Sequence, residues 1–303
     1  MRSSALFFTC LLLGASACAG SDDDGTSAAS TEADSGSGDT GGSDDAVADG
    51  ADDAITPVDG GESTGTVEPP PPGIACDSEF EYLGLVGCLS VVDGLDVKYF
   101  PLPEGTQVQR LVLFFHGDTG GDWFDDWGFR PEIMEWAQSQ DMLVMGIKAP
   151  SMYDGDTEPS YGAAQPDHAE LVTTTIETFI EQYGVVEERS LYWGISGGSW
   201  FFTSSFIPVA GARIPGIFAA NCGGSGVSFG WTWDPATDTA TRDLNALLLN
   251  YGDQDFLADP SQASYEEYTE LGFATDQVVY PGATHCDHPI AEPTIAFWES
   301  QLP

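Results

Sequence analysis

The sequence predicts an α/β domain with a mostly parallel central sheet and helices on both faces, preceded by a long disordered segment. From Arg110 onward, short apolar runs typical of buried parallel strands alternate with stretches that have the spacing of amphipathic helices. Before Gly73, by contrast, the chain consists largely of Gly, Ser, Thr, Ala and Asp. The roughly 230 residues from Gly73 onward are enough for one well-buried domain.

The chain begins with the features of an export signal. Arg2 precedes an apolar run over residues 5–13, which is too short to span a membrane. Residues 1–17 are therefore expected to be a signal peptide. The sequence Ala-Ser-Ala-Cys at residues 15–18 resembles a bacterial lipobox, which implies a lipid on Cys18 and a cell-envelope location. The same residues would also suit ordinary signal peptidase and secretion, so both alternatives place the mature chain outside the cytoplasm.

Residues 18–72 are expected to form a disordered acidic linker. From Ala19 to Pro72 the chain has 14 acidic residues and no Lys, Arg or aromatic residue, and it ends in four prolines. Such a segment cannot bury enough apolar surface to offset the entropy lost on ordering. Residues 73–303 are then the folded domain.

The charge of the chain argues against nucleic-acid partners. The whole chain has a formal net charge of −41. Residues 73–303 contain seven Lys or Arg against 35 Asp or Glu, which leaves a net charge of −28. A domain this acidic repels DNA, RNA and anionic lipid, so contact with a membrane is expected only through a lipid on Cys18.

Within the domain, hydrophobic patterning places the elements in order. Apolar runs predict strands at residues 80–92, 95–102, 110–115, 142–147, 190–193, 217–221, 246–251 and 277–280. Helical spacing predicts helices at residues 131–139, 167–183, 261–271 and 294–301. Pro131 suits a first helical turn, and Asp167 suits an N-cap. This alternation of strands and helices implies a mostly parallel sheet covered on both faces.

Four cysteines lie in the domain, and an even number in an exported chain indicates disulfide bonds. Cys76 and Cys88 flank a short segment at the start of the domain, which favours a local bridge. Cys222 and Cys286 would then form the second pair. The sequence has no Cys-x-x-Cys and no histidine cluster of metal-ligand type, so neither a metal nor a cofactor is expected.

The strongest chemical signal is the pattern Gly194-x-Ser196-x-Gly198, between an apolar run and a run that could open a helix. A serine hydroxyl becomes a nucleophile when it is held outward, beside a base and beside amide donors. A sharp strand-to-helix turn holds it so, and this turn needs small residues two positions before and after the serine. Ser196 is therefore the candidate nucleophile. An ordinary Gly/Ser turn has the same pattern, so only the surrounding motifs can distinguish a nucleophile from such a turn.

The loop His116-Gly117-Asp118-Thr119-Gly120-Gly121 follows the first parallel strand. A glycine-rich loop there allows a backbone N–H to point at the space above the serine. We expect oxyanion donors in the amides of Gly197 and Asp118, with Thr119 as the alternative to Asp118. His116 is interpreted as a structural histidine that holds this loop. A phosphate-binding role is not expected, because no Gly-Lys-Ser/Thr follows.

Two later loops contain candidates for an acid and a base. Asp255 lies three residues past Gly252 and is the candidate that orients a histidine, with Asp253 as the alternative. His285 follows Pro-Gly-Ala-Thr after the last strand and is the candidate general base, with His288 as the alternative.

The order Ser196, Asp255, His285, each after an apolar strand, resembles that of the α/β-hydrolase superfamily. Residues 110–303 are similar to the secreted group that includes polyhydroxybutyrate depolymerases, feruloyl esterases and acetyl xylan esterases. The motifs that carry this resemblance are His116-Gly117, Asp126-Trp127-Gly128-Phe129, Gly194-Ile195-Ser196-Gly197-Gly198 and Gly282-Ala283-Thr284-His285.

The resemblance implies an α/β-hydrolase fold for residues 73–303 and the activity of a cofactor-free serine esterase on small or polymeric esters. Ser196 would attack the ester carbonyl, His285 would relay the proton and Asp255 would orient His285. A Cys222–Cys286 bridge would pin the histidine loop, as related bridges do in some secreted esterases.

Substrate contacts are expected from tryptophans near these loops, although each of them could equally pack in the core. The candidates are Trp123, Trp200 and Trp231, with Trp127 and Trp233 close by. Two competing interpretations are a peptidase of the same fold and a catalytically silent domain that binds a ligand, because fold does not determine substrate.

Overall fold

The structure is a computed structural model that describes residues 73–120, 129–153, 158–161, 166–226 and 239–303. The predicted signal peptide and linker lie outside the described residues. The main feature is a nine-stranded sheet in the order β1-β2-β3-β5-β4-β8-β9-β10-β11. Its strands are β1 (Ser78–Tyr82), β2 (Leu85–Val92), β3 (Leu95–Phe100), β4 (Leu111–Phe115), β5 (Leu143–Ile147), β8 (Ser190–Ile195), β9 (Gly216–Asn221), β10 (Ala246–Gly252) and β11 (Ala274–Tyr280).

The sheet is parallel from β5 through β11 and antiparallel at the β1–β3 edge. A small separate ladder pairs β6 (Met152–Tyr153) with β7 (Glu158–Pro159). Because the six central strands run the same way, their carboxyl ends meet at one edge of the sheet, where α/β proteins bind ligands.

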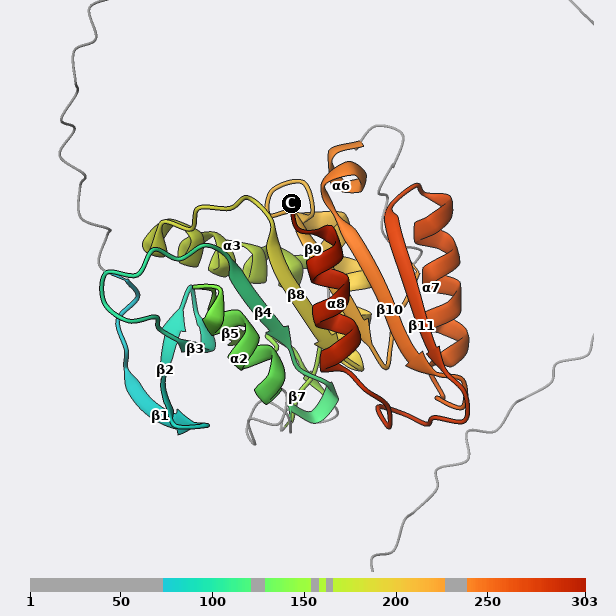
Figure 1. The fold of residues 1–303 in the computed structure, drawn as a ribbon, viewed down its shortest axis with the longest axis horizontal. Coiled ribbons are helices and arrows are strands. Elements are labelled where there is room, and N and C mark those ends of the chain that lie inside the picture. Colours follow the sequence, from blue (N-terminus) through green and yellow to red (C-terminus); the bar gives the residue numbers. More distant parts are fainter. Residues whose placement is uncertain (1–72, 121–128, 154–157, 162–165, 227–238) are drawn as a thin grey trace, which may run out of the picture. The chain divides into compact units, whose positions relative to one another are not determined.

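Helices cover both faces of the sheet, as predicted. In front of the sheet in Figure 1 lie α2 (Pro131–Ser139) and α8 (Ala291–Gln301). The other helices are α3 (Pro166–Tyr183), α4 (Gly197–Phe201), the π-helical turn η2 (Phe202–Phe206), α5 (Ile207–Ala210), α6 (Thr239–Leu244) and α7 (Ala258–Glu270). Helix α3 packs on α5 and η2, whereas α2 packs on α8 and β5.

Strand β4 shows why a continuous apolar run becomes a central strand. Leu113 and Phe115 point into the core under α3, whereas Val112 and Phe114 point into the core under α2 and α8. All five residues of β4 are buried, because alternate side chains of a strand face opposite sides of the sheet. The two cores hold the central strands, and with them the loops at their carboxyl ends, in fixed positions.

Several element boundaries differ from the sequence prediction by one to three residues, and one predicted strand is divided. The expected strand over residues 80–92 is two strands, because Leu83 and Gly84 form a turn with φ of 52° and 76°. Alternating apolar residues on both sides of this turn gave no sign of the break. Asp167 is not an N-cap, since α3 begins one residue earlier; it lies in the first turn, where a carboxylate still favours the helix dipole.

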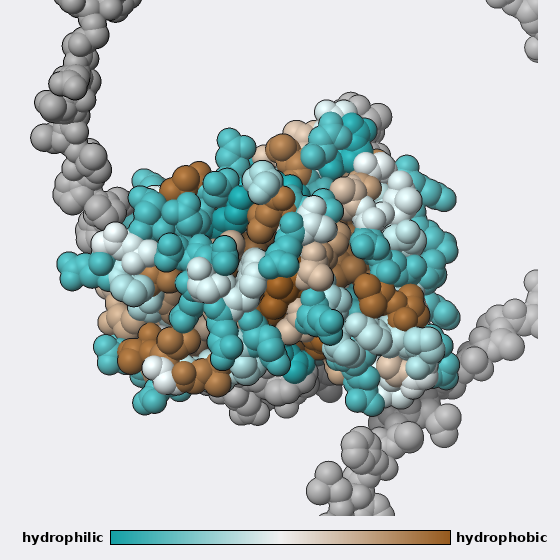
Figure 2. Space-filling view, viewed as in Figure 1, coloured by the Kyte–Doolittle hydropathy of each residue, from teal (hydrophilic) through white to brown (hydrophobic). Residues whose placement is uncertain are grey.

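The surface agrees with the acidic composition. Figure 2 shows hydrophilic residues over much of the face seen there, with hydrophobic residues in small groups, one of them over the β1–β2 hairpin. Exposed apolar side chains in that hairpin include Leu83 and Val86. In the described part of the chain, every helix is too short or too polar to cross a bilayer.

The local disulfide bond predicted at the domain entrance is present. Cys76 is bonded to Cys88 in β2, and the Cα atoms lie 5.2 Å apart. The bridge ties the first residues of the domain to the antiparallel edge of the sheet, far along the chain from Ser196. It adds a covalent link to the hydrogen bonds that hold the same segment, among them that of the Tyr99 hydroxyl to the carbonyl oxygen of Ile74.

Candidate functional site

Ser196 stands at a sharp turn between β8 and α4, as the Gly-x-Ser-x-Gly pattern predicts. Its backbone has φ 51° and ψ −114°, a conformation that costs free energy in a residue with a side chain. The flanking glycines are needed for close packing. A Cβ on Gly198 would lie 2.1 Å from the carbonyl oxygen of Phe115, and one on Gly194 would lie 2.7 Å from the amide nitrogen of Ser199. Only glycine therefore allows the chain to turn here against β4.

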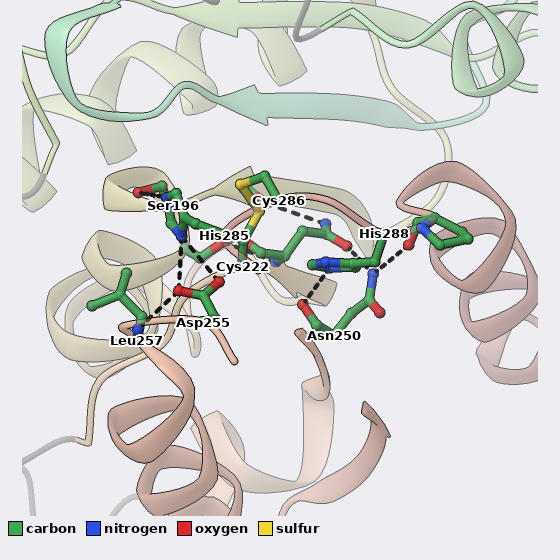
Figure 3. The surroundings of a disulfide bond; sticks show 12 residues. Ser196, Cys222, Asn250, Asp255, Leu257, His285, Cys286 and His288 are labelled. Carbon is green, nitrogen blue, oxygen red and sulfur yellow. Dashed lines mark hydrogen bonds and ion pairs between the residues drawn. A yellow bond between two sulfur atoms is a disulfide. The ribbon is translucent and has the colours of Figure 1, made fainter. Parts of the chain in front are cut away.

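Three side chains from separate loops form one hydrogen-bonded chain at this edge of the sheet. His285 Nε2 lies 3.1 Å from Ser196 Oγ, and His285 Nδ1 lies 2.9 Å and 3.0 Å from the two carboxylate oxygens of Asp255. Figure 3 shows the imidazole between the serine and the carboxylate. A carboxylate only accepts hydrogen bonds, so Nδ1 carries the proton and Nε2 accepts from the serine hydroxyl.

The Asp255 carboxylate is held from both sides. Its side chain has no exposed surface, and Oδ1 also accepts a hydrogen bond from the amide of Leu257 at 2.8 Å. The loop itself packs tightly on the histidine loop, since a Cβ on Gly252 would lie 2.2 Å from the carbonyl oxygen of Ala283. The orientation of His285 thus depends on a fixed, buried acceptor.

The two alternative residues lie elsewhere. Asp253 is exposed, and its carboxylate accepts a hydrogen bond from the amide of Gly282 at 2.6 Å, so it closes the loop. His288 Nε2 donates to the carbonyl oxygen of Asn250 at 3.3 Å, and its ring stacks on Tyr280. Burial lowers the pKa of His288, which favours its neutral form. The structure brings together Asp255 and His285 with Ser196.

The second predicted disulfide bond joins Cys222 to Cys286, with Cα atoms 5.1 Å apart. Cys286 directly follows His285. Cys222 directly follows β9, the strand beside β8, and precedes Gly223, where a Cβ would lie only 2.7 Å from the carbonyl oxygen of Ser196. Figure 3 shows the bridge beside the hydrogen-bonded chain. One covalent bond therefore links the histidine loop to the segment after β9, which packs against the serine turn.

The predicted oxyanion residues lie together. Asp118 opens the short 3-10 helix η1 (Asp118–Gly120), and a Cβ on Gly197 would lie 2.1 Å from Asp118 Oδ1. The buried Ser160 hydroxyl donates to that same oxygen at 2.5 Å, which fixes the carboxylate. Gly197 is the first residue of α4, so its amide lies among the helix N–H groups that have no intrahelical acceptor. The Thr119 side chain lies outside the described part of the chain.

His116 has the structural position expected of it. Its side chain is fully buried, Nδ1 donates to the carbonyl oxygen of Gly117 at 2.6 Å, and Nε2 accepts from the amide of Ala149 at 2.8 Å. Burial lowers the pKa of His116 to about 4, because water no longer solvates the charged ring. A neutral imidazole thus joins the loops after β4 and β5 beneath the proposed oxyanion residues.

Of the tryptophans expected to contact substrate, Trp200 is described and Trp123 and Trp231 lie outside the described residues. Trp200 is half-buried on α4, and its amide donates to the carbonyl oxygen of Ser196 at 2.9 Å. The prediction missed Phe256, whose ring centre lies 4.4 Å from that of His285. The available signal was an aromatic residue directly after the candidate acid.

Metal binding has no support in the described ranges, where no three His, Cys, Asp or Glu residues are grouped to hold an ion. The polar groups near Ser196 are used instead in hydrogen bonds to one another.

No family profile matches the sequence, and no curated protein is significantly similar to it. Solved structures match in fold. Esterase PE8 has a TM-score of 0.50 and 18% identity, over 69% of this chain and 99% of that chain. TT1662 from Thermus thermophilus has a TM-score of 0.50 and 16% identity, over 71% of this chain and 96% of that chain. A Pyrobaculum calidifontis esterase has a TM-score of 0.51 and 12% identity, over 76% of this chain and 87% of that chain.

The chain has the α/β-hydrolase fold, as predicted from the motif order. This conclusion combines the sheet, the strand-to-helix turn at Ser196 and the matching solved structures. At these identities the likeness concerns the fold. The narrower resemblance to the polyhydroxybutyrate depolymerase, feruloyl esterase and acetyl xylan esterase group stays a prediction.

Proposed function

We propose that this protein is a serine hydrolase that cleaves carboxylic esters through an acyl-enzyme intermediate. The observation that carries the proposal is the hydrogen-bonded chain from Ser196 Oγ through His285 to Asp255, at the carboxyl edge of the parallel sheet. In this arrangement a base lies next to a serine hydroxyl and a fixed carboxylate sets the tautomer of the base.

In the first half of the reaction, His285 Nε2 takes the hydroxyl proton as Ser196 Oγ bonds to the ester carbonyl carbon. The negative charge that develops on the carbonyl oxygen would be bound by the amides of Gly197 and Asp118; loss of one such donor costs about 10²–10³-fold in kcat in serine hydrolases. The ester C–O bond then breaks, and the imidazolium gives its proton to the leaving alcohol oxygen.

In the second half, a water molecule takes the place of the alcohol. His285 Nε2 accepts a proton from the water as the water oxygen attacks the acyl carbon. The same proton then passes to Ser196 Oγ when the acyl–serine bond breaks. Asp255 stabilises the imidazolium in both halves. These proton transfers use Ser196, His285, the water molecule and the leaving alcohol, while Asp255 stays ionised.

We also propose that the protein is exported and anchored through a lipid on Cys18. The features that support this are the N-terminal Arg2, the apolar run at residues 5–13 and the lipobox-like residues 15–18. The two disulfide bonds of the domain are in keeping with an oxidising compartment. Replacing Cys18 by Ala should release the protein from the membrane fraction if a lipid holds it there, and an unchanged distribution would contradict the anchor.

Hydrolysis of p-nitrophenyl acetate by the purified protein tests the esterase activity. Ser196→Ala should lower kcat by about 10⁴-fold or more, because the nucleophile is gone. Ser204→Ala is the matched control: this buried hydroxyl in η2 bonds only to Ser205 in the described structure, and its loss should leave kcat within about two-fold.

The same experiment separates the competing functions. Turnover of peptides but not esters by the wild type would favour a peptidase of this fold. A folded wild-type protein that hydrolyses neither esters nor peptides, with the same result for Ser196→Ala, would favour a silent binding domain.

A further inference from the structure

We propose that Phe256 is the residue that selects for an apolar alcohol in the ester substrate. The inference rests on the proposed esterase function and extends it to the side of the substrate that leaves first. It assigns to Phe256 a contact with an alkyl or aryl alcohol, placed against the ring of His285.

Phe256 is the most exposed large apolar side chain in the described part of the chain, with 74% of its surface accessible. Its ring nevertheless has a defined neighbour, since it lies 4.4 Å from the His285 ring at an interplanar angle of 39°. An exposed phenyl ring beside a reactive group offers apolar surface that the alkyl or aryl part of a bound substrate can cover.

The backbone on both sides of Phe256 is fixed. Asp255 Oδ1 accepts a hydrogen bond from the amide of Leu257, and the carbonyl oxygen of Asp255 accepts one from the amide of Ala258. The backbone of Phe256 is therefore held at the site, and this places the ring beside His285. Pre-organised contacts of this kind lose little entropy when a ligand binds.

The chemistry of the reaction determines which half of the ester lies here. The leaving alcohol oxygen must come within hydrogen-bond distance of His285 Nε2 to receive its proton. The carbonyl oxygen must instead point to the amide of Gly197, which belongs to α4 and not to the histidine loop. The alcohol therefore lies on the histidine side of the site, where Phe256 is.

The ring of Phe256 contributes apolar surface and no hydrogen-bonding group. It should thus favour alcohols with alkyl chains or aromatic rings over small polar ones. A methylene that becomes covered gains about two- to four-fold in kcat/KM, because burial of one CH₂ is worth up to ~0.8 kcal/mol.

Two ester series measured on the full-length protein test this assignment. The first keeps the acyl group as acetate and lengthens the alcohol from methyl to hexyl. The second keeps p-nitrophenol and lengthens the acyl chain from acetate to octanoate. For wild type, kcat/KM should rise along the alcohol series. Phe256→Ala should flatten that rise and leave the slope of the acyl series unchanged, and Phe256→Leu should restore part of the rise.

Val186→Ala is the matched control. Val186 is also exposed, at 55%, but it precedes β8 and so lies at the opposite edge of the sheet from Ser196. It should leave both slopes as in wild type.

A uniform loss with every alcohol would show that Phe256 only positions His285, and it would overturn the proposal. A changed slope in the acyl series with an unchanged alcohol slope would also overturn it. Wild-type protein that hydrolyses no ester in either series would contradict the proposed function itself, a result that is distinct from both.

Discussion

At the scale of single residues, the site depends on which atoms carry protons. His285 must keep Nδ1 protonated so that Nε2 can accept from Ser196, and the buried carboxylate of Asp255 imposes this tautomer. His116 must stay neutral so that one nitrogen donates to the carbonyl oxygen of Gly117 and the other accepts from the amide of Ala149. His285 thus lies between two side chains that take part in the proposed reaction, whereas His116 bonds only to backbone groups in these contacts.

Replacing Asp255 by Asn should lower kcat on the order of 10⁴-fold, because an amide nitrogen facing Nδ1 favours the wrong tautomer. The loop should persist, since the amide oxygen can still accept from Leu257. Steady-state ester hydrolysis measures the effect. Asp253→Asn is the matched control and should cost less than about ten-fold in kcat, because Asp253 bonds to the loop and not to the imidazole. A larger loss at Asp253 than at Asp255 would contradict the assignment.

The buried neutral state of His116 predicts a dependence of folding stability on pH. Its pKa is about 4 in the folded protein and ~6.5 when unfolded, so between these values the unfolded chain binds more protons. The contribution of His116 is therefore complete above pH ~6.5 and is lost as the pH falls toward ~4, by about 3 kcal/mol in total.

Urea unfolding at several pH values between ~4 and ~7 checks this, with His116→Gln as the comparison, because glutamine does not titrate. The free energy of unfolding of the wild type should fall more steeply with acid than that of the variant. Parallel curves for the two proteins would show that His116 does not carry this dependence.

At the scale of elements, the serine turn and the histidine loop are positioned by packing and by the Cys222–Cys286 bond. The end of β9 lies against the serine turn, and the loop after β11 lies against the end of β10. Because small displacements of reacting groups cost about 100-fold in rate, the disulfide between these loops should matter for activity and not only for stability.

Substituting both Cys222 and Cys286 by Ser should lower kcat at least ten-fold at a temperature where the protein remains folded. The double Cys76→Ser, Cys88→Ser variant is the matched control and should keep kcat within about two-fold, since that bridge is at the domain entrance. Loop closure alone predicts losses of about 4 and 3 kcal/mol in unfolding free energy, for sequence separations of 64 and 12 residues. Equal activity losses in both variants would contradict the positioning role.

The sequence predicted most of the central sheet, because strands such as β4 and β8 are buried on both faces and so are apolar throughout. It also predicted the residues of the hydrogen-bonded chain, because each follows such a strand. The prediction from sequence was wrong where a local pattern fits two different structures. The alternation around Leu83 fits one long strand as well as a hairpin, and only the pairing of β1 with β2 decides between them.

Local patterns predicted the bounds of α2 correctly but not the start of α7 or the exposed contact of Phe256. Helix α7 begins at Ala258, three residues before the predicted start, because Pro260 is tolerated in a first turn. Phe256 looks like any aromatic residue near a strand end. Its exposure and its contact with His285 depend on how two loops 30 residues apart in the sequence meet.

At the scale of the whole molecule, the domain carries far more negative than positive charge. Residues 73–303 have a net charge of −28, and only seven Lys or Arg are available for ion pairs. Ion pairs such as Arg213 with Glu170 and Glu177 are partly exposed and contribute little to stability. Repulsion among the remaining carboxylates should therefore destabilise the folded state at low salt.

Raising NaCl from ~0.02 M to ~0.5 M should increase Tm by about 5 °C, because the screening length falls below the distance between surface carboxylates. Differential scanning calorimetry measures the shift. The same change of salt at a pH near ~4 should give a smaller shift, since many carboxylates are then protonated. A Tm that falls or stays constant with salt at neutral pH would contradict the account of repulsion.

The most direct test of the central claim is to find which atom of the protein reacts with an activated electrophile. The purified protein would be incubated with a fluorophosphonate, and the modified residue would be identified by mass spectrometry of its peptides. We expect one adduct, on Ser196, that is absent in both Ser196→Ala and His285→Ala and present in Ser204→Ala. A folded wild-type protein without an adduct, or with the adduct on another residue, would show that Ser196 is not an activated nucleophile.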